Sequence, residues 1–154
     1  MAHDKIVFVL WADRFDETLA ALFVAELRKA GLRVKLVSLA GQPSPGAYGV
    51  TLVPDLTLEQ ALPLARYATA VVIPCGASGF NRLQNDPRMQ EFLVQTSQAG
   101  ATFVVSQAGV VDLEGFGWPG VAVPPVVEYS QGRETMDDVR QVVGSLVEAS
   151  DGKI

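Results

Sequence analysis

The sequence has very few of the residues that build disulfides, metal centres or nucleic-acid interfaces. It contains one cysteine and one histidine in 154 residues, so an internal disulfide is impossible and a Cys/His metal cluster is not expected. The 12 basic residues are outnumbered by 17 acidic ones and form no basic stripe, which argues against a nucleic-acid partner. No apolar run reaches the about 20 residues of a membrane span, and the start of the chain lacks a signal-peptide pattern. We therefore expect a cytoplasmic protein that holds no metal and no other cofactor.

What the sequence does have is enough apolar residues for a buried core. Hydrophobic residues make up 49% of the chain and charged residues 19%, which excludes a disordered chain. We find no internal repeat, low-complexity segment or linker. Residues 1–154 are therefore expected to form a single domain.

Four apolar runs have the length of strands and do not alternate with polar residues. They are Ile6–Trp11, Val34–Leu39, Ala70–Pro74 and Thr102–Ser106. Such runs are typical of parallel strands that are covered on both faces. Apolar residues repeat with helical spacing in 16–30, after 86 and in 135–149, whereas the Gly- and Pro-rich segment 41–55 predicts a hairpin or flap outside the main sheet. The pattern predicts an α/β fold of the flavodoxin-like type, an open parallel sheet with helices on both faces (three layers, α/β/α).

Several separate segments resemble, in the right order, the ThiJ/PfpI proteins, which are relatives of the class I glutamine amidotransferases. These segments are Lys5–Trp11 with the acidic turn Ala12–Glu17, Val37–Gly41, Gly49–Asp55, Val71–Gly76 and Asp86–Arg88. The resemblance runs from residue 5 to about residue 110. It implies a homodimer, and a site with a reactive cysteine on a sharp strand-to-helix turn, a glutamate on the first helix and a downstream histidine.

The residues that carry this chemistry in the family are replaced here. The cysteine position falls on Gln107, whose neutral amide cannot act as that nucleophile. Shifting the alignment by one residue offers Ser106, but no base for it is visible. The glutamate position is Leu19, and the only histidine is His3 near the start of the chain. The resemblance thus implies a catalytically degenerate homodimer that binds a small-molecule ligand or a protein partner.

Cys75 offers an alternative, because it replaces the first glycine of the loop that forms the family's oxyanion hole. It could be a redox-sensitive or ligand-binding thiol, or simply a small buried side chain. The alternative function is a hydrolase- or lyase-like enzyme whose relocated site combines Cys75 with Asp13 or Asp16. We expect Asp13, Asp16 and Glu17 mainly to cap the following helix and complement its positive end, with Glu17 pointing away from Leu19.

The residues expected to line the pocket by family position come from the ends of several strands. They are Trp11, Asp13, Asp16, Leu19, Cys75, Gly76, Gln107 and Ala108. Trp11 and Trp118 are also compatible with ordinary packing or with a subunit interface.

Overall fold

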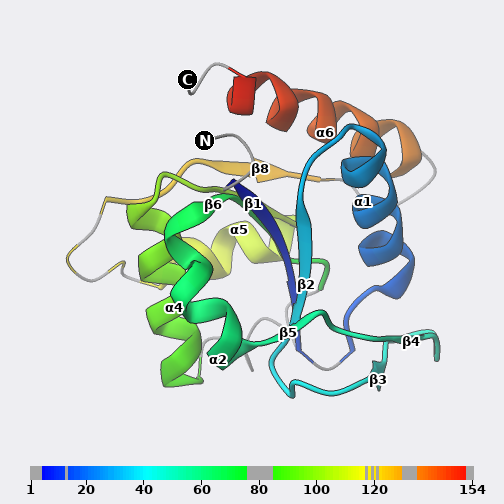
Figure 1. The fold of residues 1–154 in the computed structure, drawn as a ribbon, viewed down its shortest axis with the longest axis horizontal. Helices are drawn as coiled ribbons and strands as arrows, with labels where there is room; N and C mark the ends of the chain where they lie inside the picture. Colours follow the sequence, from blue (N-terminus) through cyan, green and yellow to red (C-terminus); the bar gives the residue numbers. More distant parts are fainter. Residues whose placement is uncertain are drawn as a thin grey trace.

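The centre of the structure is a six-stranded sheet in which each strand runs parallel to its neighbours (Figure 1). This computed structural model describes residues 5–12, 14–75, 85–116, 118, 120, 122–129 and 135–151. The strands are β1 (Ile6–Trp11), β2 (Val34–Ser38), β5 (Leu56–Thr57), β6 (Ala68–Val72), β7 (Thr102–Val105) and β8 (Val126–Glu128), in the order β5-β2-β1-β6-β7-β8. The predicted α/β fold with an open parallel sheet is confirmed.

The strands form where the apolar runs were identified because both faces of the sheet are covered. All six residues of β1 are buried, and β1 pairs with β2 on one side and β6 on the other. Helices α1 (Glu17–Lys29) and α6 (Thr135–Asp151) cover one face, whereas α2 (Leu58–Ala61), the 3₁₀ helix η2 (Leu62–Tyr67) and α4 (Pro87–Gln98) cover the other (Figure 1). The last helix, α5 (Gln107–Glu114), follows β7 directly. The three layers therefore match the prediction.

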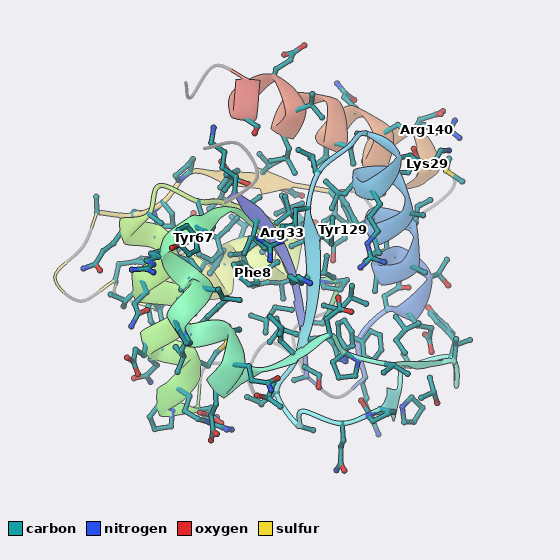
Figure 2. The ribbon with its side chains drawn as sticks, viewed as in Figure 1. Phe8, Lys29, Arg33, Tyr67, Tyr129 and Arg140 are labelled. Carbon is teal, nitrogen blue, oxygen red and sulfur yellow. The ribbon has the colours of Figure 1, made fainter. Side chains whose placement is uncertain are left out.

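Aromatic contacts identify which face of the sheet each helix covers. The ring of Phe8 meets that of Phe92 in α4 at a centroid distance of 5.2 Å. On the opposite face, Tyr129 meets Phe23 of α1 at 5.5 Å, and Figure 2 labels Tyr129 on this side. Tyr129 directly follows β8, so the residue after this strand packs on the face that α1 covers.

Two helix starts have side-chain caps, of which the sequence predicts the Asp16 cap. The side chain of Asp16 accepts a hydrogen bond from the backbone N–H of Leu19 at 3.0 Å, which caps α1. Thr57 and Gln60 form a reciprocal capping box at α2. These caps fix where each helix leaves the carboxyl edge of the sheet.

The predicted flap is a small antiparallel hairpin outside the main sheet. It consists of β3 (Ser44–Pro45) and β4 (Thr51–Leu52) and lies beside the start of α1 (Figure 1). We call residues 44–53 the hairpin. Its exposed side chains include Tyr48, Val50 and Val53, which are 74%, 54% and 67% exposed.

Among the described residues, no helix combines the length and apolar character of a membrane span. Over the same ranges, no group of three or more His, Cys, Asp or Glu side chains could hold a metal ion.

Candidate functional site

The carboxyl edge of the sheet brings the ends of β1, β6, β7 and β8 together. Val72 of β6 pairs with Val104 of β7, which in turn pairs with Val127 of β8. Beyond these pairs the ladder continues, since Tyr129 N donates to Val105 O at 2.9 Å. Two residues further along β7 and β8, Ser106 and Tyr129 therefore lie side by side on the face that α1 covers.

Ser106 is the N-cap of α5 and occupies the turn where the family's nucleophile is expected. Its Oγ accepts a hydrogen bond from Gly109 N at 3.4 Å and donates one to the carbonyl of Cys75 at 3.3 Å. A Cβ added to Gly109 would lie 2.8 Å from Cβ of Val105, so this close approach requires glycine. The strand-to-helix turn is thus intact, but its hydroxyl is used to hold the backbone.

Gln107 and Leu19 stand at the positions of the family's cysteine and glutamate, and neither side chain can replace the group found there in the family. Gln107 is the first residue of α5, and its side chain is exposed. Leu19 is buried in the hydrophobic core under α1. The arrangement therefore has neither a nucleophile at the turn nor a carboxylate beside it at these positions.

Cys75 is buried just beyond the end of β6. Its backbone N donates to Ile73 O at 3.0 Å, and its carbonyl accepts the Ser106 hydroxyl. The neighbouring backbone is also tied to α1, because Asp16 N donates to Pro74 O at 2.7 Å. The backbone around Cys75 is therefore hydrogen-bonded both to the turn after β7 and to the start of α1.

Tyr129 completes this cluster, and the sequence reasoning missed it. It is buried, and its hydroxyl donates to Ile73 O at 3.1 Å. Burial raises the pKa of the Tyr129 phenol well above its ordinary value, as do the nearby Cys75 and Asp16, while a hydrogen bond with the Ser106 hydroxyl opposes the rise. Asp16, Cys75, Ser106 and Tyr129 thus converge at one place, and we call them the edge cluster. The only signal for Tyr129 was the short extended run before it.

Trp11 ends β1 on the same edge and is completely buried. Its ring stacks on that of Phe15 at 4.7 Å between centroids, with an interplanar angle of 25°. Its indole N–H has no acceptor within the described part of the chain. Trp118 packs instead against Phe103 and Phe116, and its indole N–H donates to Leu113 O. The packing interpretation fits both tryptophans, and Trp11 in addition has an indole N–H without an acceptor among the described residues.

Three of the expected pocket positions cannot be placed. Asp13 and Gly76 lie outside the described residues, as does the side chain of Ala108.

Glu17 lies in the first turn of α1, where its charge complements the positive helix end as expected, but the cap itself is Asp16. The residue is only 2% exposed, and its carboxylate also reaches the hairpin. The N–H of Tyr48 donates to Oε1 at 2.9 Å and to Oε2 at 3.1 Å, and the N–H of Val50 donates to Oε2 at 2.9 Å. Burial alone would raise the pKa of this carboxyl, but backbone hydrogen bonds from Tyr48, Val50, Glu17 and Gly49 together hold the pKa below its ordinary value. Glu17 is therefore an ionised group that binds backbone of the hairpin.

Gly46 makes this approach possible. A Cβ at this position would lie 2.5 Å from Oε2 of Glu17 and 2.8 Å from the carbonyl oxygen of Phe15. That carbonyl accepts the N–H of Ala47 at 2.9 Å. The hairpin is thus held against the start of α1 by backbone and carboxylate together.

A sequence profile of the DJ-1/PfpI family matches residues 5–112, and the chain belongs to this family. The resemblance to the ThiJ/PfpI proteins is thereby confirmed. No curated protein matches the sequence.

Solved structures of the DJ-1 type share the fold. A variant of a DJ-1 superfamily protein from Salmonella typhimurium matches with a TM-score of 0.74 and 22% identity over 96% of this chain and 91% of its own. Oxidized DJ-1 from Toxoplasma gondii matches with a TM-score of 0.72 and 17% identity over 96% of this chain and 95% of its own. DJ-1beta from Drosophila melanogaster matches with a TM-score of 0.71 and 17% identity over 96% of this chain and 94% of its own. At these identities the similarity shows the fold alone.

Proposed function

We propose that this DJ-1/PfpI protein acts by binding and not by catalysis, and that it does so as a homodimer. The observation that carries the proposal is the turn after β7, where an exposed Gln107 stands at the nucleophile position and the adjacent Ser106 hydroxyl caps α5. Leu19 is buried where the family has its supporting glutamate, and the one histidine is His3. Nucleophilic catalysis needs a base within hydrogen-bond reach of the nucleophile, and none of these residues supplies such a pair.

The carboxyl edge is the place where a small-molecule ligand is expected. Ligands of open α/β sheets bind outside the carboxyl ends of the strands. The hydroxyls of Ser106 and Tyr129 there are bonded to backbone carbonyls, whereas Trp11 supplies a buried indole N–H that has no acceptor among the described residues. These groups support recognition of a small polar molecule.

The hairpin supports the homodimer. Tyr48, Val50 and Val53 are large and exposed, and residues 41–54 include no charged side chain. Interface cores are poor in charge and rich in tyrosine. Two copies that each carry a net charge of −5 repel one another least where they meet through an uncharged surface.

Turnover assays test the absence of catalysis. The purified protein should not convert glyoxals or peptides faster than the protein-free reaction. Turnover that disappears in Cys75→Ser would contradict the proposal. Binding is tested separately by thermal unfolding with a panel of small polar compounds, since a ligand that binds only the folded state raises the midpoint. A rise that is lost in Tyr129→Phe would place the ligand at the edge cluster.

Sedimentation at increasing protein concentration tests the homodimer. We expect a dimer for the natural chain and a monomer for Val50→Asp. The matched control is Val111→Asp, because Val111 is 65% exposed on α5, away from the hairpin. A natural chain that stays monomeric at every concentration, or a Val50→Asp variant that stays dimeric, argues against this dimer.

A second candidate is an enzyme that uses Cys75, which the convergence of the edge cluster favours. Such an enzyme needs a reactive thiolate, so the thiol pKa must lie well below the free value of about 8.5. The rate of alkylation of Cys75 as a function of pH measures it. A titration near the free value, or above it, removes this candidate.

A further inference from the structure

Glu17 is the link between the hairpin and the start of α1. Its carboxylate accepts the N–H groups of Tyr48 and Val50, and no described basic side chain forms an ion pair with it. The negative charge is therefore balanced by backbone N–H groups and by the positive end of α1, where Glu17 is the first residue. Hydrogen bonds to an ionised acceptor are stronger than those between neutral groups, so the hairpin is held firmly.

The two residues before Glu17 connect the same point to the carboxyl edge of the sheet. Asp16 N donates to Pro74 O at 2.7 Å, and Pro74 directly precedes Cys75. Phe15 stacks on Trp11, while its carbonyl accepts the N–H of Ala47 in the hairpin. Three consecutive residues thus contact the hairpin on one side and the strand ends on the other.

We propose that Phe15, Asp16 and Glu17 couple the hairpin to residues 73–75 at the end of β6, so that these two described segments open and close as one unit. Glu17 is the positioning residue of this unit. When its carboxylate is withdrawn, the N–H groups of Tyr48 and Val50 lose their acceptor. The hairpin then no longer braces the start of α1, where Asp16 N donates to Pro74 O. Segments of a folded protein that share such contacts open cooperatively.

One consequence rests on the proposed homodimer. A second copy that binds Tyr48, Val50 and Val53 stabilises the closed hairpin. Through Glu17, it then also lowers the accessibility of Cys75. Association at the hairpin would in this way control exposure of the edge cluster.

Hydrogen exchange of the natural chain gives the first test. The amides of Tyr48, Val50 and Asp16 are the donors of the coupled contacts, so they should show the same free energy of opening. The rate at which a thiol reagent modifies Cys75 under native conditions should report the same opening equilibrium. Clearly different opening free energies for the hairpin amides and for Asp16 would overturn the proposal.

Glu17→Gln gives the second test, because an amide group cannot accept from both N–H groups without bringing its own N–H₂ against one of them. We expect exchange at Tyr48 and Val50, and modification of Cys75, to accelerate together by about tenfold or more. Gly46→Ala, which pushes a methyl group into the carboxylate, should act in the same direction. Glu148→Gln removes a charge from the exposed side of α6 and should change neither rate.

Urea unfolding of each variant separates local from global effects. The Cys75 rate is compared in conditions of equal global stability, where a merely structural loss has no remaining effect. Faster hairpin exchange with an unchanged Cys75 rate would show that the hairpin opens alone and would overturn the coupling. The proposed homodimer is judged independently by native mass, since Glu17→Gln can be measured in a dilute monomeric sample. If the natural chain is monomeric, the homodimer fails while the exchange data still decide the coupling.

Discussion

Removal of the Tyr129 hydroxyl tests how the edge cluster is held together. In Tyr129→Phe the ring remains against Phe23, and only the hydrogen bond to Ile73 O (3.1 Å) and the contact with the Ser106 hydroxyl are lost. The carbonyl of Ile73 also accepts Cys75 N at 3.0 Å, so it keeps one donor. The free energy of unfolding should therefore fall by the contribution of an ordinary hydrogen bond, about 0.5–1.5 kcal/mol. It should not fall by the larger penalty of an unpaired buried carbonyl.

Urea unfolding followed by tryptophan fluorescence measures this difference. The midpoint should fall while the slope m stays constant, and the thermal midpoint should fall by about 2–4 °C per kcal/mol. Tyr48→Phe is the matched control, because its hydroxyl belongs to a side chain that is 74% exposed. Tyr129→Ala also removes the buried ring and should cost about 3–5 kcal/mol.

Two outcomes would refute the reasoning. An unchanged midpoint for Tyr129→Phe would mean that the hydroxyl forms no net stabilising bond in solution. A fall in the free energy of unfolding above about 3 kcal/mol would mean that Tyr129 is the one effective hydrogen-bond donor to the Ile73 carbonyl.

Gly109→Ala should lower the free energy of unfolding by about 1–3 kcal/mol in the same urea assay, because the new methyl group meets Val105; an unchanged value would contradict the close packing at this turn. The lowered pKa of Glu17 contributes stability above its ordinary value of 4.5, and this stability is lost as pH falls through the folded-state pKa. Glu17→Gln should therefore flatten the acid limb of a plot of stability against pH, and an identical limb would contradict the burial of an ionised carboxylate. The raised pKa of Tyr129 contributes stability below its ordinary value of 10.0 that is lost at higher pH. Its phenolate absorbance should appear only as the protein unfolds in alkali and be missing in Tyr129→Phe; its appearance in the folded protein would contradict the buried position.

The sequence predicts the sheet well because its signal is local and strong. Strands β1, β2, β6 and β7 are apolar on both faces, which a parallel sheet covered by helices requires. Even there the bounds differ, since β6 begins at Ala68 instead of Ala70. Ala68 pairs with Ile6 before a register shift, a contact that no local pattern reveals.

The candidate site is predicted less completely, because its contacts join distant parts of the chain. The replacement of the family's chemical residues at Leu19 and Gln107 can be read from single positions. The partners of Glu17 lie 31 and 33 positions further along the chain, and helical periodicity says nothing about them. Tyr129 comes next to Ser106 only because β8 pairs with β7, and the segment before β8 has no clear periodic pattern.

The turn after β7 has a consequence for how this family can diverge. Its shape depends on the cap at Ser106 and on the small size of Gly109, whereas the side chain between β7 and the body of α5, Gln107, extends into solvent. Folding of this chain therefore places little constraint on the side chain at position 107, so its chemistry can change without loss of a packing contact. In this turn, the residues that hold the backbone and the residue at the nucleophile position are thus separate.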